Sequence, residues 1–266
     1  GEVAQRVDTG DDPERRPQEL LDIIPTNRRQ GYDARALIRH VVDNGDFFEM
    51  RKLYASGIIT GFARMDGWSV GVIGSDPMSK AGAMDGNAAD KYTHFLDLCD
   101  SFNLPLLIFL DMPGFMLGSH AERIATMRRG ARALIASAEC QVPKIEFMVR
   151  KSYGVAADAP NSIGLPNGIN LRFGWPSGEW GGIPIEGGVA AAYRREIEAA
   201  DDPAAHREAI EERLLRLRSP FKAAHKGDVV DLIDPRETRA LACRFVKLAQ
   251  PKLAELANRP KRAVRP

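Results

Sequence analysis

The sequence has few cysteines, no excess of charge of either sign and no long apolar run, and each absence narrows the range of functions. Its three cysteines, Cys99, Cys140 and Cys243, form no Cys-x-x-Cys pair, so they predict free thiols in a reducing compartment rather than disulfides or a zinc site. The 37 Lys and Arg balance 36 Asp and Glu, which favours neither nucleic acid nor a membrane surface as a partner. No run approaches the roughly 20 apolar residues that a membrane helix needs. We therefore expect a protein of the cytoplasm, or of the mitochondrial matrix if its source is eukaryotic.

The motifs of several common catalytic classes are missing as well. The five histidines show no His-x-x-x-His or His-Glu-x-x-His spacing, so we expect no metal site. A serine hydrolase would need Gly-x-Ser-x-Gly, which does not occur, and the glycine-bearing loop at residues 75–85 lacks both the Walker and the GxGxxG patterns. This favours chemistry in which the substrate or a carried cofactor moves the proton.

What is present indicates one α/β domain between two polar ends. The chain has 266 residues, of which 44% are hydrophobic and 27% charged, enough to bury a sizeable core. Residues 1–32 are predicted to form an extended linker whose apolar element, residues 20–25, docks onto the body. Residues 33–251 are predicted to form the folded domain, and residues 252–266 a loose basic tail.

Strands and helices alternate along the predicted domain, which favours a mainly parallel sheet covered by helices. Asp33 and Asp234 are predicted to cap the first and last helices, and Asp66-Gly67 predicts a hairpin turn. The predicted strands are residues 58–64, 68–74, 104–111, 145–149, 169–173 and 228–233. The predicted helices lie at residues 33–44, 85–102, 119–138, 189–199 and 204–216, with the last one beginning at residue 234.

The stretch from residue 142 to residue 158 holds the main candidate site. A short apolar run ends at Arg150-Lys151, Gly154 opens a turn, and small residues then begin a helix. Such a turn leaves several backbone N–H groups unpaired and aimed at one point, where they can bind an oxyanion. An ordinary β–α turn has the same pattern, so the residues alone leave both interpretations open.

Two acidic residues are further candidates. Asp111 begins Asp-Met-Pro-Gly-Phe after a buried strand, where open α/β sheets place ligand loops. It could act as an acid or base, or simply cap the following turn. Asp158 comes one helical turn after Gly154, where its carboxylate could point into a pocket or favour the helix N-terminus.

A series of sequence blocks in a fixed order resembles a known family. The blocks are ELLDIIP (19–25), YD (32–33), DFFE (46–49), TGFARMDG (60–67), FLDLCDSFNLPLL (95–107), DMPGF (111–115), GARALIASAECQVPKI (130–145), RKSYG (150–154) and GDVVDLIDPRETRA (227–240). They resemble the carboxyltransferase (beta) subunit of biotin-dependent acyl-CoA carboxylases of the propionyl-CoA carboxylase type. The resemblance covers about residues 12–251 and is specific to the C-terminal half of that subunit.

The resemblance implies a crotonase-like fold of repeated ββα units, present here as a single C-terminal carboxyltransferase domain. It implies transfer of a carboxyl group from carboxybiotin, held on a carrier protein, to the α-carbon of an acyl-CoA thioester. Biotin's nitrogen takes the α-proton, while backbone N–H groups hold the negative charge. The implied partners are an N-terminal carboxyltransferase half, a biotin carboxylase and a biotin carrier subunit, in a homo- or hetero-oligomer.

By position, the family's oxyanion hole falls on the N–H groups of Val155 and Ala156, beside Gly154. Asp158 falls on an acidic position that borders the acyl pocket, and the neighbouring loops would supply Gly82, Ala83, Gly114 and Phe115. Three departures lie on this side of the site. Val155 replaces a glycine and would be strained at a positive φ, Pro160 would end or kink the helix, and residues 175–188 are richer in glycine and tryptophan than in the family.

The missing N-terminal half leaves two origins open: a fragment of a longer subunit, or a split subunit, which we favour. Two other functions also remain open at this point. One is a non-catalytic assembly half, and the other is a related biotin-dependent acyl-CoA decarboxylase.

Overall fold

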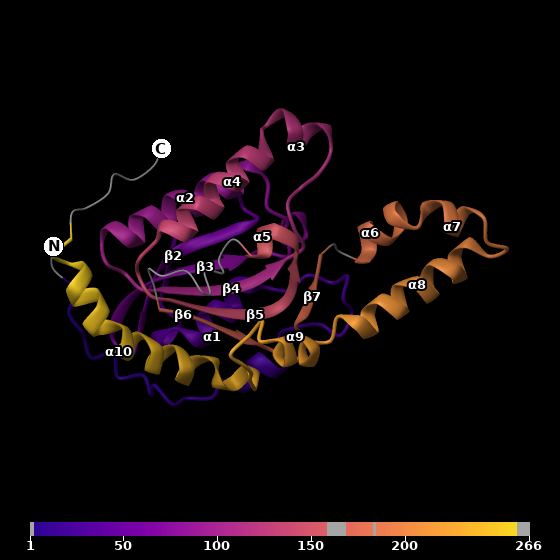
Figure 1. Ribbon diagram of the computed structural model, residues 1–266. Coiled ribbons are helices and arrows are strands. Elements are labelled where there is room, and N and C mark those ends of the chain that lie inside the picture. Colours follow the sequence, from indigo (N-terminus) through magenta and orange to yellow (C-terminus); the bar gives the residue numbers. More distant parts are fainter. Residues whose placement is uncertain (1–2, 159–168, 183–184, 260–266) are drawn as a thin grey trace.

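One twisted sheet runs through the centre of the molecule between two layers of helices (Figure 1). The computed structural model describes residues 3–158, 169–182 and 185–259. The strands are β1 (Phe47–Met50), β2 (Ile58–Met65), β3 (Trp68–Ser75), β4 (Leu106–Met112), β5 (Lys144–Tyr153), β6 (Asn170–Gly174), β7 (Glu179–Gly181) and β8 (Asp231–Leu232). The helices are α1 (Ala34–Val41), α2 (Gly86–Ser101), α3 (Ser119–Arg123), α4 (Thr126–Glu139), α5 (Gly154–Asp158), α6 (Ile185–Ala192), α7 (Arg194–Glu198), α8 (Pro203–Leu217), α9 (Pro220–Lys226) and α10 (Thr238–Leu256).

The sheet begins with three antiparallel strands, β1 to β3, and continues from β3 as a parallel sheet. Its order in the described chain is β1-β2-β3-β4-β5-β6-β8, with β7 beside the end of β5. Met65 pairs with Trp68 across the predicted turn, where Asp66 and Gly67 both have positive φ (48° and 77°), as a tight hairpin requires. The predicted hairpin and the predicted parallel sheet are therefore confirmed.

Two apolar cores hold the layers together. On one face, α1 and α10 pack against the sheet around a stack of Phe109, Phe147 and Phe173, whose neighbouring ring centroids lie 5.7 and 6.1 Å apart. On the other face, α2 and α4 cover β3 and β4. The three cysteines are free and buried in these cores, and burial raises the pKa of each thiol.

The central strand, β5, is longer than the sequence predicts, and all ten of its residues are buried. The prediction that Arg150-Lys151 ends this strand is wrong, because the Arg150 guanidinium is paired with Asp111 at 2.9 Å. Arg150 also donates to the carbonyl of Gln30 and lies 5.0 Å from the ring of Tyr32. A paired arginine can occupy a buried position that an unpaired charge would not tolerate.

Two predicted helix boundaries also differ. The predicted helix at 119–138 is two helices, because Ala125 adopts a left-handed conformation (φ 56°) between α3 and α4. At the other end of the chain α10 continues through Pro251 to Leu256. Pro251 is on the exposed side of that helix, while Leu253 and Leu256 are buried and hold its last turn against the core. Strands β1 and β7 and helix α9 were not predicted.

The segment before α1 lies along the body and is bonded to it. Leu20, in the short 3₁₀ helix Gln18–Leu21, is buried at 1% exposure, so its docking is confirmed. Val7 donates to the carbonyl of Gly67, and the buried Arg239 donates to the carbonyls of Asp11 and Asp12.

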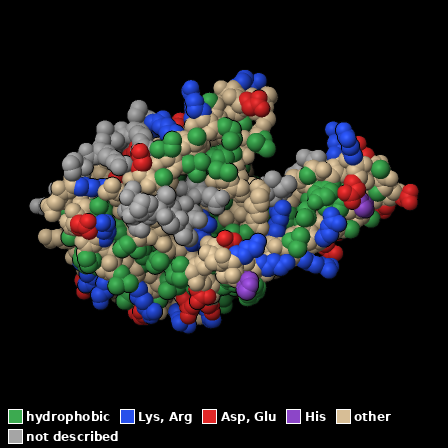
Figure 2. All heavy atoms as spheres, viewed as in Figure 1, with side chains coloured by type: hydrophobic (Ala, Val, Ile, Leu, Met, Phe, Trp, Pro, Cys, Tyr) green, Lys and Arg blue, Asp and Glu red, His purple; other side chains and the backbone are tan. Residues whose placement is uncertain are grey.

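Helices α6, α7 and α8 form a projection that we call the arm; the rest of the fold is the body. The arm stands away from the sheet (Figure 1), and its surface mixes apolar, basic and acidic side chains (Figure 2). Inside it, Ile185, Val189 and Ile210 form a small separate core. Among the described helices of body and arm, none combines the length and apolar character of a membrane span.

Candidate functional site

The candidate site begins where β5 ends, at Gly154 and Val155, which we call the donor turn. Gly154 has φ 62°, and a Cβ on it would lie 3.1 Å from the carbonyl oxygen of Gly182. Glycine therefore takes the left-handed conformation that the turn needs. Val155 is not among the residues with positive φ, so the condition under which it would be strained is not met.

The donor turn starts α5, so its amides have no acceptor inside the helix. Outside this helix, no described residue accepts a hydrogen bond from the N–H of Val155 or Ala156. Val155 is 55% exposed, whereas Ala156 is fully buried. The predicted end of this helix at Pro160 falls outside the described residues.

A cavity of about 690 Å³ opens in front of the donor turn. Its lining is rich in hydrogen-bond donors and in positive charge. The lining includes Ser152, Gly154 and Val155 at the end of β5, Trp180, Gly181 and Gly182 from β7 onward, and Arg218, Ser219, Lys222 and Lys226 at the α8–α9 corner.

Positive charge dominates one wall of this cavity. Lys222 and Lys226 lie one turn apart on α9 and share a face of that helix, an arrangement of like charges that weakens an isolated helix. Arg218 lies with its guanidinium carbon 5.0 Å from the ring centroid of Tyr153. Asp228 is the acidic side chain of the described lining. The wall therefore favours an anionic ligand.

One lining donor lacks an acceptor. The indole Nε1 of Trp180 is buried and has no hydrogen-bond partner in the described part of the chain, and a buried donor left unpaired costs about 1–3 kcal/mol. A ligand with several acceptor oxygens suits this lining better than an apolar one.

A largely buried carboxylate on β7 contacts the residue before the donor turn. Glu179 on β7 accepts two guanidinium hydrogen bonds from Arg28, at 2.6 and 2.5 Å, and one from the hydroxyl of Tyr153 at 2.5 Å. Burial alone would raise the pKa of Glu179, but the bonds from Arg28 and Tyr153 outweigh it and hold the pKa below its ordinary value. Burial, followed by the charge of Glu179, raises the pKa of Tyr153. We call Arg28, Glu179 and Tyr153 the clamp.

The loops predicted to border the site lie together but outside the described lining of the cavity. Met84 donates to the carbonyl of Gly114 at 3.0 Å and forms a bridge with Phe115. The predicted residues in these loops are Gly82, Ala83, Gly114 and Phe115. A Cβ on Gly114 would lie 3.6 Å from the carbonyl oxygen of Tyr153, so this loop does approach the donor turn.

Of the predicted residues, the structure brings Gly154 and Val155 to the cavity. Ala156 is buried and is not part of the described lining. Asp158 is the last residue of α5, and the position of its side chain lies outside what is described.

Asp111, the other acidic candidate, is 1% exposed, pairs with Arg150 and accepts the amide of Lys151 at 3.0 Å. Its contacts are those of a structural carboxylate joining β4 to β5.

Several residues around the site were missed from the sequence. Arg28 lies in the predicted linker and Glu179 in a predicted loop. Arg218, Lys222 and Lys226 lie between the predicted helix at 204–216 and the predicted strand at 228–233, where no element was predicted. A weak signal existed in Arg-Ser-Pro at 218–220, where Pro begins a new helix and so turns the chain. The pairing of Arg28 with Glu179 joins residues 151 positions apart, which no local pattern reveals.

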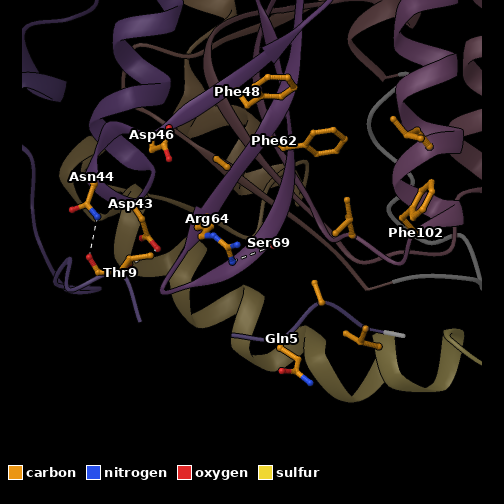
Figure 3. A pocket seen from close by; sticks show the side chains of 15 residues that line it. Gln5, Thr9, Asp43, Asn44, Asp46, Phe48, Phe62, Arg64, Ser69 and Phe102 are labelled. Carbon is orange, nitrogen blue, oxygen red and sulfur yellow. Dashed lines mark hydrogen bonds between the residues drawn. The ribbon is translucent and has the colours of Figure 1, made fainter. Parts of the chain in front are cut away.

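A second cavity, of about 800 Å³, lies at the opposite end of the parallel strands. Phe48 on β1 and Phe62 on β2 lie on one side and Phe102 on the other (Figure 3). Its Asp43 accepts the backbone amides of Asp66 and Gly67 and pairs with a buried arginine. Because ligands of parallel sheets bind at the carboxyl ends of the strands, the cavity at the donor turn is the better candidate.

The fold and the donor turn define a crotonase-like α/β domain. The chain belongs to the carboxyl transferase domain family, whose model matches residues 2–264. It is 41% identical over 235 residues to the propionyl-CoA carboxylase carboxyltransferase subunit of Haloferax mediterranei, covering 88% of this chain and 45% of that protein. It is 40% identical over 238 residues to the methylmalonyl-CoA decarboxylase subunit alpha of Veillonella parvula, covering 90% of this chain and 45% of that protein.

A solved structure shows the same likeness. The transcarboxylase 12S hexamer with bound methylmalonyl-coenzyme A superimposes with a TM-score of 0.83 at 37% identity, covering all of this chain and 49% of that one. The chain thus spans about half the length of the curated relatives it matches. The predicted family and fold are confirmed.

Proposed function

We propose that this chain is the carboxyltransferase component of a biotin-dependent acyl-CoA carboxylase, moving a carboxyl group from carboxybiotin to the α-carbon of an acyl-CoA. The observation that carries the proposal is the Val155 amide, which has no described acceptor outside its helix and opens onto a donor-rich cavity. A backbone N–H fixed in this way stabilises negative charge on an oxygen without having to reorganise during the reaction.

The lining fits a carboxylated biotin. Val155 N–H and the orphaned Trp180 Nε1 are donors for carbonyl-type oxygens, and the wall of Arg218, Lys222 and Lys226 matches a carboxylate. When bound, carboxybiotin supplies the carboxyl group and a ring nitrogen that can take the acyl α-proton. The chain itself binds the ring, holds the charge that develops on oxygen at Val155 and orients the carboxylate.

The remaining parts of the reaction belong to partners. We propose an N-terminal carboxyltransferase half that binds the CoA thioester, together with a biotin carboxylase and a biotin carrier subunit. The half-length match to longer relatives and the hexamer of the transcarboxylase 12S structure support an oligomeric assembly. The free, buried cysteines support the cytoplasm, or the mitochondrial matrix of a eukaryote, as the location.

Replacing Val155 with proline tests the proposal because it removes one N–H at the start of a helix, where proline is tolerated. We expect carboxyl transfer, measured with the N-terminal half, a biotinylated carrier and an acyl-CoA, to fall about 10²- to 10³-fold. Val155→Ala keeps the N–H and serves as the matched control. If Val155→Pro folds, as judged by circular dichroism, and transfers at the normal rate, the oxyanion assignment is wrong.

The likeness to a methylmalonyl-CoA decarboxylase subunit supports a second candidate, in which the transfer runs in the reverse direction. The donor turn serves both directions, since the same charge develops on the same oxygen. Requirement for ATP separates them: carboxylation depends on ATP and the biotin carboxylase, whereas decarboxylation of a carboxylated acyl-CoA proceeds without either.

A further inference from the structure

The clamp grips the residue immediately before the donor turn. Tyr153 is fully buried, and its hydroxyl donates to Oε2 of Glu179 at 2.5 Å. Arg28 binds both oxygens of the same carboxylate and so fixes its plane. The carboxylate is largely buried, with 15% of the Glu179 side chain exposed. The position of Tyr153 is therefore set by a charged, oriented acceptor.

The backbone at the end of β5 is also held by strand pairing on both sides. On one side β4 pairs with β5 as far as Ser152, which lies opposite Met112. β7 has three residues and pairs with the end of β5, Tyr153 lying opposite Gly181. A Cβ on Gly181 would lie 3.0 Å from the Arg218 guanidinium and 3.2 Å from the Tyr153 ring. Gly154 in turn packs against the carbonyl of Gly182. The pairing with β4 ends at Ser152 and β7 has three residues, so the side-chain clamp adds restraint at Tyr153, the residue next to the donor turn.

We propose that Glu179 is a positioning residue for the donor turn: it acts through the Tyr153 hydroxyl to fix where the Val155 N–H points, and Arg28 keeps its carboxylate turned toward that hydroxyl. The kinetic consequence rests on the proposed function. A donor that acts on developing charge must be placed within a fraction of an ångström, and a shift of about 1 Å can cost up to about 10²-fold in rate.

The clamp differs from an ordinary ion pair because it joins three separate segments of the chain next to the cavity. Arg28 belongs to the segment before α1, Glu179 to β7, and Tyr153 to the central strand. The side chain of Tyr153 contacts Arg218, which lines the cavity, and its hydroxyl donates to Glu179. The clamp thus connects the N-terminal segment to the cavity through a single side chain.

Tyr153→Phe and Glu179→Gln test the inference in the full chain assembled with its N-terminal half. Both should lower kcat about tenfold with KM for the biotinylated carrier changed less than about twofold, because placement of the donor matters most in the transition state. The double variant should lose no more than either single one, since both remove the same connection. Arg28→Met, which leaves the Tyr153–Glu179 bond in place, should lower kcat by a smaller factor.

Arg29→Met is the matched control, because the neighbouring Arg29 makes a looser pair with Glu211 at 3.7 Å and its side chain is 70% exposed. A second measurement does not depend on enzyme activity: the ¹H–¹⁵N signal of the Val155 amide should shift in Tyr153→Phe and Glu179→Gln but not in Arg29→Met.

The inference is overturned if kcat is unchanged in folded Tyr153→Phe and Glu179→Gln, or if their losses are additive in the double variant. If Val155→Pro abolishes transfer while these variants do not affect it, the proposed function stands and the clamp is only structural; if none affects it, the proposed function fails.

Discussion

The body and the arm of this chain stabilise their helices and strands in different ways. In the body, all ten residues of β5 are buried, including four with charged side chains. In the arm, α8 is longer, with 15 residues, yet Ile210 is its one buried residue. A region with few buried contacts opens at low free-energy cost and can do so without the rest. We infer that the body unfolds as one unit and that the arm can unfold separately.

The candidate cavity lies where these two regions meet. The donor turn comes from the rigid β5, whereas Arg218 follows directly after the last residue of α8. The wall of positive charge therefore combines Arg218, at the end of the arm, with Lys222 and Lys226 on α9 of the body. We infer that the donor turn and the two lysines are held by the body core, while Arg218 moves with the arm.

The largest effect is expected from the centre of the body core. Phe147 is fully buried on β5, between Phe109 and Phe173. Phe147→Ala removes the middle ring and leaves a cavity, so the free energy of unfolding should fall by about 3–5 kcal/mol. Urea denaturation followed by circular dichroism measures it. Phe221→Ala, at a phenylalanine that is 69% exposed, should change it by less than about 0.5 kcal/mol.

The sequence predicted the body well because its signals are local. The Asp66-Gly67 turn, the Asp33 cap and the alternating apolar runs each fix one element, and the structure contains all of them. The length of β5 could not be predicted, since the partner that makes Arg150 tolerable, Asp111, lies 39 residues earlier. Local patterns do not encode such pairings.

The candidate site was predicted only in part, for the same reason. The donor turn follows from a strand, a glycine and small residues, all adjacent in the chain. The clamp and the cationic wall are assembled from segments far apart, and Glu179 and Lys222 have nothing distinctive nearby in the sequence. Loop residues acquire such roles from the surface that they are placed on.

A smaller effect, confined to the arm, is expected from Ile210→Ala. Ile210 is 3% exposed and packs with Ile185 and Val189. The change should destabilise the arm locally by about 2 kcal/mol, at the low end for a buried Ile→Ala because the arm core is small. Hydrogen exchange should accelerate in α6 and α8 while the amides of β5 exchange as before. Equal acceleration in β5 would show that body and arm unfold together, contrary to the comparison.

A pH-dependent effect is expected from a charge that the body buries. Lys91 on α2 is 1% exposed and donates to the carbonyls of Arg51 and Tyr54 at 3.0 and 2.9 Å. Burial lowers the pKa of Lys91 to about 8, from an ordinary value of 10.5. Between these two pH values the unfolded chain keeps a proton that the folded chain has lost. The contribution of Lys91 to the free energy of unfolding therefore rises with pH from about 8 to 10.5 and is flat below pH 8.

The measurement compares Lys91→Met with the unmodified chain by urea denaturation across this pH range. The buried thiols pull the other way, since the raised pKa values of Cys140 and Cys243, about 11 and 12, make folding less favourable as pH rises. Their contribution cancels when the two chains are subtracted, leaving that of Lys91. Lys91→Arg should lose the rise as well, because arginine keeps its proton throughout the range. A rise that persists in both variants would assign the pH dependence to another group, and would show that burial in the body leaves the charge of Lys91 undisturbed.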